Sequence, residues 1–385
     1  MVRGTIRTTS GGGGWVTIAP EMGYQLHTNL TEPEAEPFRA HLDRVFQAFS
    51  KRFGVAQADG PPMPVYLYRT PWQYKDALRQ HGINTAHSGG LYFRTDQHRA
   101  LATFFRDRGY HEVFAVLQHE GFHQFADDRF GEALPLWLNE GLAQYFEDGL
   151  MVGNTFHVGL LNTYRLAVVQ DALAGGHLDE LRDMLSVDMD KLNQLLMHNP
   201  VRAYLLYGVW WSFVIFLIQG DNGAHLPVVH HALKQILATG QPQDITPLSE
   251  LEQSWHAFLR QAEPDPLSQT LTRMTVLGDL MTLMFERERR QHTMWEELRR
   301  RARIRQIEIV ERHHHGADKT YHADDERLYV YTRPDGQEAS FQIEPNDDPN
   351  LPAHVSAAHA KGKPRLIWHR DHKRKVMPQI VFDGG

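Results

Sequence analysis

The sequence contains no cysteine among its 385 residues. Disulfide frameworks, thiolate zinc fingers, iron–sulfur clusters and cysteine nucleophiles are therefore excluded. A transition metal bound by this chain would need histidine and carboxylate ligands. Histidine itself is abundant, with 24 residues, so a histidine motif arises by accident more often here than in an average chain.

The sequence also lacks an excess of positive charge, because it has 40 Lys and Arg residues and 47 Asp and Glu residues. This balance argues against a general attraction to nucleic acid or anionic lipid. The first 14 residues lack the apolar core of a signal peptide. The most apolar stretch, 203–218, is shorter than the ~20 residues that span a bilayer. We therefore expect a soluble, cytoplasmic protein without a membrane partner, and an exported, processed form stays an alternative.

The length and the 42% of hydrophobic residues predict two or three domains with a sizeable core. The expected elements run from strands and one amphipathic helix to a series of helices. This order is typical of an α+β fold with a mixed sheet packed on a helical half. We expect a flexible lead-in over 1–19, the α+β domain over 20–263, a long connecting helix over 264–304 and a small β-rich tail domain over 305–385.

One helix, expected at about 109–127, carries the motif HEGFH at 119–123. Residues four apart lie about 40° apart around a helix, so both imidazoles share one face and can bind one cation. The intervening Glu120 lies beside such a cation, where its carboxylate can take a proton from a water. The HExxH spacing thus predicts two zinc ligands and a general base.

A second helix, expected at about 139–148, offers a third ligand in Glu140. Sixteen residues separate His123 from Glu140, which is enough to turn the chain and start an antiparallel helix. Glu140 can then reach the cation shared by His119 and His123, and a fourth position stays open to water. We expect one zinc ion per chain, which would lower the pKa of that water towards ~7.

The segments HEGFHQ and PLWLNEGLAQYFE together resemble the gluzincin metallopeptidases, and the second is similar to the WLNEG segment of the aminopeptidase N family. The resemblance implies a thermolysin-like fold and peptide hydrolysis, with His119, His123 and Glu140 as zinc ligands and Glu120 as base. A closer likeness is to uncharacterised bacterial peptidase-like domains of the same clan, and it covers about residues 20–262.

The resemblance also suggests two further parts of a catalytic site. Gluzincins commonly stabilise the oxyanion with a tyrosine or histidine after the third ligand, and Tyr207 is the candidate here, followed by Tyr204. In the clan an edge strand pairs with the substrate backbone, and Gly90, Leu91 and Tyr92 match that segment. A buried core tyrosine and an ordinary hairpin strand are the respective alternatives.

Several polar residues are placed to support the predicted ligands. Imidazole ligands usually donate their second N–H to an oxygen, and Asn139, Gln144 and Glu147 are the candidates. Asp127 lies on the same helix face as His123, four residues later. It is expected to support the ligands or, alternatively, to replace one of them.

These features favour a zinc-dependent peptidase acting on peptide or protein substrates, with Glu120 as general base and acid. The main alternative is a catalytically silent module of the same fold that docks a protein partner. A third hypothesis is nucleic-acid binding through the basic segment 361–375, which includes Trp368, although a solvated tail also explains it. The histidines at 313–315 and 230–231 are expected at the surface, and the oligomeric state is left open.

Overall fold

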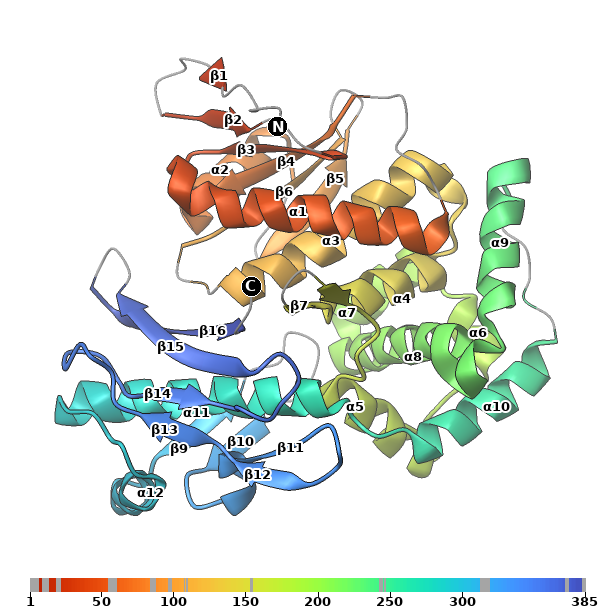
Figure 1. Cartoon of the computed structure of the whole chain (residues 1–385). Helices are drawn as coiled ribbons and strands as arrows, with labels where there is room; N and C mark the ends of the chain where they lie inside the picture. Colours follow the sequence, from red (N-terminus) through yellow and green to blue (C-terminus); the bar gives the residue numbers. More distant parts are fainter. Residues whose placement is uncertain are drawn as a thin grey trace. The chain divides into compact units, whose positions relative to one another are not determined.

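The computed structural model describes residues 7–8, 14–18, 22–54, 61–83, 88–95, 99–106, 108, 110–152, 155–241, 245, 247–311, 319–370 and 374–382. It is a mixed α+β protein, with 55% of the described residues in helices and 19% in strands, as the sequence predicts (Figure 1). The chain divides into two compact units. The first comprises Met1–Gly149, Glu180–Met189 and Trp210–Trp255, and the second comprises Leu150–Asp179, Asp190–Val209 and His256–Gly385. The domain boundaries expected from the sequence stay a prediction.

The first unit contains a six-stranded mixed sheet. Its strands follow the order β1 (Arg7–Thr8), β2 (Val16–Ile18), β3 (Tyr24–Thr28), β4 (Met63–Tyr68), β6 (Arg99–Phe104) and β5 (Gly90–Arg94). The pairs β3–β4 and β4–β6 are parallel, and the other pairs are antiparallel. Strand β5 therefore forms one edge of the sheet.

Helices cover both faces of this sheet. The helices assigned wholly to the first unit are α1 (Glu32–Phe53), α2 (Pro71–Gln80), α3 (Tyr110–Phe130), α4 (Leu136–Glu147), α6 (Leu181–Leu185) and α9 (Leu226–Thr239), with the 3₁₀ turns η1 (Gly131–Ala133) and η2 (Gly220–Gly223). Helices α8 (Pro200–Gln219) and α10 (Leu248–Gln261) contribute residues to both units.

The sequence of α1 explains its position on the sheet. The Glu34 side chain accepts a hydrogen bond from the Thr31 backbone at its start, and Gly54 ends it in a left-handed conformation. Its apolar residues recur at helical spacing and are buried. Among them, Phe46 packs edge-to-face against Tyr24 of β3, with ring centroids 5.7 Å apart.

Helix α3 packs on the same face of the sheet as α1. Its Phe125 ring lies 5.9 Å from the Phe46 ring, and the Tyr24 hydroxyl donates to the backbone oxygen of Gly121 at 2.6 Å. On the opposite face, α2 buries Tyr74 and Leu78 in a separate apolar cluster. Both faces of the central strands are thus covered, and α3 is fixed directly against the sheet.

The second unit combines helices with several small antiparallel sheets. Its remaining helical elements are α5 (Thr163–Ala174), α7 (Met189–His198, except its first residue), α11 (Pro266–Glu288), α12 (Trp295–Ile304) and the 3₁₀ turn η3 (Glu326–Tyr329). Its strands are β7 (Leu150–Val152), β8 (Thr155–His157), β9 (Glu308–Glu311), β10 (Lys319–His322), β11 (Val330–Thr332), β12 (Glu338–Ser340), β13 (Gln342–Glu344), β14 (His354–Ser356), β15 (Pro364–Arg370) and β16 (Val376–Phe382). The last four form one sheet in the order β13-β14-β15-β16.

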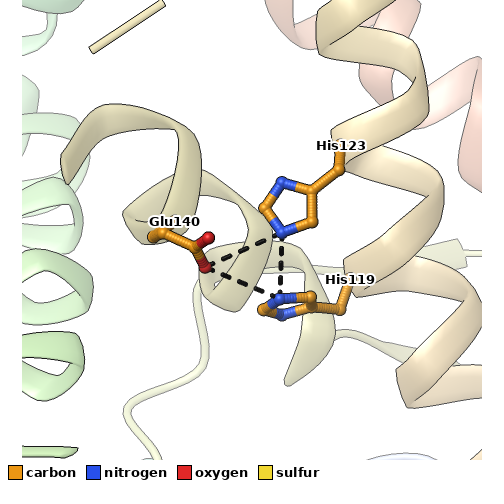
Figure 2. Close-up of side chains that lie close together, drawn as sticks. All are labelled: His119, His123 and Glu140. Atoms are coloured by element: carbon orange, nitrogen blue, oxygen red, sulfur yellow. Dashed lines mark hydrogen bonds and ion pairs between the residues drawn. The ribbon is translucent and has the colours of Figure 1, made fainter. Parts of the chain in front are cut away.

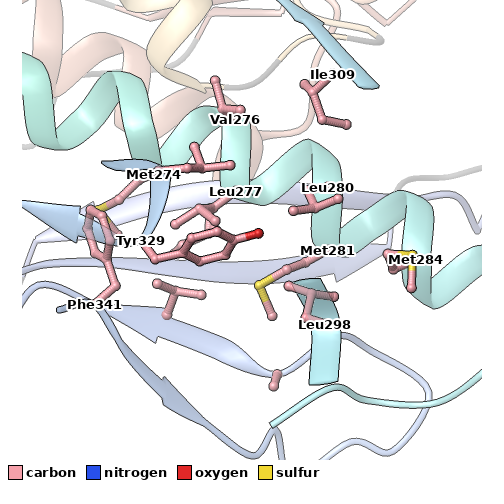
Figure 3. Close-up of a cluster of buried hydrophobic side chains, with 14 of the residues drawn as sticks. Met274, Val276, Leu277, Leu280, Met281, Met284, Leu298, Ile309, Tyr329 and Phe341 are labelled. Atoms are coloured by element: carbon pink, nitrogen blue, oxygen red, sulfur yellow. The ribbon is translucent and has the colours of Figure 1, made fainter. Parts of the chain in front are cut away.

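One face of α11 forms the core of this unit. Met274, Leu277, Leu280 and Met281 are each at most 2% exposed and pack against strands and loops of the C-terminal segment (Figure 3). This burial, rather than helix propensity alone, stabilises a helix of this length.

The prediction of one long helix over 264–304 is wrong, because the structure has two helices there, α11 and α12. Helix α11 ends where Arg289 adopts a left-handed conformation with φ of 55°. The buried Glu288 carboxylate then pairs with Arg301 of α12 and with Arg305, the residue that follows this helix. Leu298 and Ala302 of α12 are fully buried in the same core as α11. Tertiary packing therefore overrides the continuous helical pattern of the sequence.

One helical span among the described residues has the length and apolar character of a membrane span. It covers Pro200–Gly223, and 72% of its most apolar 18-residue window is buried inside the protein. Such burial is also typical of the core helix of a soluble protein, as expected for 203–218. The cellular location stays a prediction.

Candidate metal centre

Three side chains predicted as metal ligands converge at the contact of α3 and α4 (Figure 2). His119 and His123 lie one turn apart on α3, and their Nε2 atoms are 3.1 Å apart. The Oε2 atom of Glu140, on α4, lies 3.7 Å from each of these nitrogens. The sequence spacing therefore brings two imidazoles and one carboxylate to a common point.

The connection between the two helices is shorter than expected. Helix α3 continues to Phe130, and Gly131 then turns the chain with φ of 59°. Helix α4 begins at Leu136, three residues earlier than predicted, so Glu140 lies in its second turn. Pro135 precedes the helix with φ of −56°, which its ring fixes in advance.

A close helix contact holds α4 in place beside α8. A Cβ atom added to Gly141 would lie 2.7 Å from the backbone oxygen of Trp210 and 2.6 Å from Cγ2 of Val214. Only glycine permits this approach, so Gly141 fixes the position of the neighbouring Glu140.

Each imidazole is oriented by an oxygen on α4. The Nδ1 atom of His119 lies 3.0 Å from Oε2 of Glu147, and that of His123 lies 3.0 Å from Oδ1 of Asn139. Both oxygens can only accept, so each Nδ1 carries a proton and each Nε2 faces the centre. Two of the three predicted supporting residues are thus found here. The third, Gln144, instead donates to the backbone oxygen of Glu140 at 3.4 Å.

The charges around the centre suit a cation. Burial lowers the pKa of His119, but the hydrogen bond and charge of Glu147 and the other nearby carboxylates outweigh it and raise this pKa to about 9. Burial and the positive charge of His119 lower the pKa of His123 to about 4. Burial raises the pKa of Glu140. At neutral pH the pair of imidazoles therefore carries a single positive charge: besides the proton on each Nδ1, one further proton lies between the two Nε2 atoms that face one another.

The donor set matches the dimensions of a tetrahedral zinc site. Bonds of about 2.0–2.1 Å give distances of about 3.3–3.4 Å between neighbouring donor atoms. The observed separations of 3.1 and 3.7 Å lie on either side of that value. Imidazole and carboxylate ligands in this number also suit zinc better than magnesium or calcium. The residues present therefore fit a zinc ion.

Glu120, the predicted base, is bound by the edge strand of the sheet. Its Oε2 atom accepts a hydrogen bond from the backbone N–H of Tyr92, in β5, at 2.7 Å. Burial raises the pKa of Glu120, while the neighbouring imidazoles oppose that shift. The predicted substrate strand, Gly90 to Tyr92, thus lies directly beside the predicted base.

Asp127 is a partner of β5 rather than of the metal ligands. Its carboxylate accepts from the Tyr92 hydroxyl at 2.7 Å and forms ion pairs with Arg94 and Arg99. The alternative role of Asp127 as a substitute ligand is therefore wrong. No sequence pattern indicates the contact with Tyr92, beyond the presence of Asp127 on the ligand face of α3.

Other candidate residues lie elsewhere. Tyr207 and Tyr204 belong to the part of α8 assigned to the second unit, so an oxyanion role stays a prediction. The histidines at 230–231 are exposed on α9, as expected, while those at 313–315 lie outside the described residues. Trp368, in the basic segment, is 4% exposed and donates to the Thr282 hydroxyl, so its ring is not displayed for stacking on a base.

A comparison with protein families places the centre within a shared segment. A family model described as a protein of unknown function, DUF1570, matches residues 113–237. The matched segment runs from α3 to α9 and includes all three candidate ligands. A search of curated proteins found no match to the chain.

Proposed function

We propose that this protein is a zinc-dependent peptidase that hydrolyses peptide bonds in peptide or protein substrates. The convergence of His119, His123 and Glu140, with Glu120 beside them, carries the proposal. The motif resemblance to gluzincins supports it, and with it we propose a gluzincin-like fold for the unit that contains α3 and α4, together with a small β-rich C-terminal domain.

The chain's donors suit one zinc ion, held by the Nε2 atoms of His119 and His123 and by the Glu140 carboxylate. Asn139 and Glu147 would keep both imidazoles in the tautomer that binds metal. A bound zinc ion would supply Lewis acidity, which brings the pKa of a water to about 7.

Glu120 performs the proton transfers in this proposal. Its carboxylate is close enough to interact electrostatically with both imidazoles, so it can take a proton from the attacking water and pass it to the leaving amine. Strand β5 would pair with the substrate backbone along its outer edge, through Gly90, Leu91 and Tyr92. Tyr207 is the proposed donor to the oxyanion.

Cleavage by the Glu120→Gln variant tests the proposal. The zinc-loaded protein is incubated with denatured proteins and a peptide library, and products are identified by mass spectrometry. We expect Glu120→Gln to keep its zinc and to lose at least about a hundredfold in cleavage rate, because a general base contributes about 10²–10⁴-fold. Glu112→Gln is the matched control, since Glu112 is an exposed residue in the first turn of the same helix.

Two results would contradict this function. Cleavage at the wild-type rate by Glu120→Gln would show that Glu120 is not the general base. A wild-type protein that binds zinc and cleaves none of these substrates would instead favour the silent docking module.

A further inference from the structure

One residue of the edge strand, Tyr92, is tied to α3 at two separate points. Its backbone N–H donates to Oε2 of Glu120, and its phenol donates to Oδ2 of Asp127, both at 2.7 Å. Glu120 and Asp127 are seven residues apart, so they lie on nearly the same face of α3, about 10 Å apart along its axis. A single residue, through its backbone and its side chain, therefore links the predicted base to a second carboxylate two turns away.

The second carboxylate is itself firmly held. The Asp127 side chain is 13% exposed and lies 3.3 Å from the Arg94 guanidinium and 3.2 Å from that of Arg99. Burial and the hydrogen bond to Asp127 raise the pKa of Tyr92, so the phenol keeps its proton and remains a donor. Asp127 therefore provides a fixed anchor for the phenol.

At the other end of β5, the strand contacts α3 directly through the backbone of a glycine. A Cβ atom added to Gly90 would lie 2.2 Å from Cγ1 of Val116, one turn before Glu120. The strand is thus held against α3 on both sides of Glu120, by direct backbone packing at Gly90 and by the phenol at Asp127.

We infer that Asp127 is a positioning residue, which acts through the Tyr92 phenol to hold the Tyr92 N–H against Glu120. This inference rests on the proposed peptidase function. With Oε2 held by the N–H, the plane of the Glu120 carboxylate is fixed, and Oε1 is the oxygen that takes the proton. Asp127 touches neither the candidate ligands nor the reacting atoms in this scheme.

Steady-state kinetics of three substitutions test the inference. We expect Tyr92→Phe and Asp127→Ala each to lower kcat about tenfold or more, because small displacements of a catalytic group have effects of this size. Zinc affinity and KM should stay within about twofold of wild type. Asp127→Asn keeps an oxygen acceptor for the phenol, so it should retain most of the wild-type kcat.

The double variant and a matched control make the test specific. Tyr92→Phe combined with Asp127→Ala should lose no more than either single change, because both remove the same contact. Tyr68→Phe removes a phenol oxygen from the same sheet, outside the candidate site, and should leave kcat unchanged. An equal loss in Asp127→Asn and Asp127→Ala would overturn the inference and leave Asp127 a structural partner of the arginines.

Hydrogen exchange of the segment 90–94 separates this inference from the proposed function. We expect the Tyr92 amide to exchange about tenfold faster in Asp127→Ala than in wild type or Asp127→Asn, because its hydrogen bond is weakened. If the wild-type protein cleaves nothing, the proposed function fails, and this exchange pattern still supports Asp127 as the anchor. Unchanged exchange in Asp127→Ala would overturn the inference whatever the activity.

Discussion

The substitution Gly141→Ala tests how the position of Glu140 is set. Gly141 follows Glu140 in α4 and faces α8 at a distance that leaves no room for a methyl group. The new Cβ would lie 2.7 Å from the Trp210 backbone oxygen, whereas an ordinary contact needs at least 3.4 Å. Val214 can rotate its side chain, but the Trp210 carbonyl belongs to a buried helix backbone. The two helices must therefore separate by about 0.7 Å.

The expected cost follows from two opposing effects. Overpacking of this kind costs about 1–3 kcal/mol, while alanine is favoured over glycine in a helix by about 1 kcal/mol. We therefore expect Gly141→Ala to lower the free energy of unfolding by up to about 2 kcal/mol, and by about 1–3 kcal/mol relative to a Gly→Ala change that meets no close contact. A shift of about 0.7 Å also exceeds the roughly 0.2 Å tolerance of metal–ligand distances, so zinc affinity should fall as well.

Urea denaturation with and without a chelator measures both effects, with tryptophan fluorescence as the signal. Gly121→Ala is the matched control, because its Cβ would meet the Tyr24 hydroxyl at 3.4 Å, which is an ordinary contact. That variant should be as stable as wild type or slightly more stable. If Gly141→Ala were as stable as Gly121→Ala, the argument that close packing on α8 positions Glu140 would be refuted.

Two further predictions concern groups around the centre and in the core. Removing the oxygen that orients one imidazole, in Glu147→Ala, should weaken zinc binding about 10–100-fold, as measured against a competing chelator, and an unchanged affinity would show that Glu147 has no orienting role. His41 is 3% exposed and stacks on Phe114 at 4.0 Å, and its burial lowers its pKa from 6.5 to about 3. Because the unfolded state takes up that proton more readily, the free energy of unfolding should fall as pH drops from about 6.5 towards 3, by at most about 1.4 kcal/mol per pH unit. The variant His41→Phe has no imidazole to protonate at this position. Its urea midpoints, measured at pH 7, 5 and 4, should therefore decline less steeply with falling pH than those of the wild type. An equal decline in both proteins would contradict the lowered pKa of His41.

The convergence of the three candidate ligands could be predicted from the sequence for a simple reason. A four-residue spacing on a helix puts His119 and His123 on one face whatever the rest of the fold does. The sixteen intervening residues allow a turn and an antiparallel helix, so Glu140 could be placed without knowledge of the sheet.

Other contacts of the site depend on distances between helices and strands, which the sequence alone does not determine. Gln144 and Glu147 both lie near the face of α4 that carries Glu140, and only the separation of the two helices decides which one reaches His119. The link between Tyr92 and Asp127 joins an edge strand to a helix, and its register follows from the sheet. The interruption at Arg289 results from packing that no local pattern encodes.

Zinc binding by the purified protein tests the central claim most directly. Metal analysis with X-ray absorption of wild type, Glu140→Ala and the exposed-site control Glu132→Gln compares the first coordination shells. The account predicts one zinc ion per chain in wild type and control, with two imidazole nitrogens and a carboxylate oxygen, and a loss of that oxygen and of affinity in Glu140→Ala. Equal affinity and an unchanged shell in Glu140→Ala, or no bound zinc in wild type at saturating metal, would contradict it.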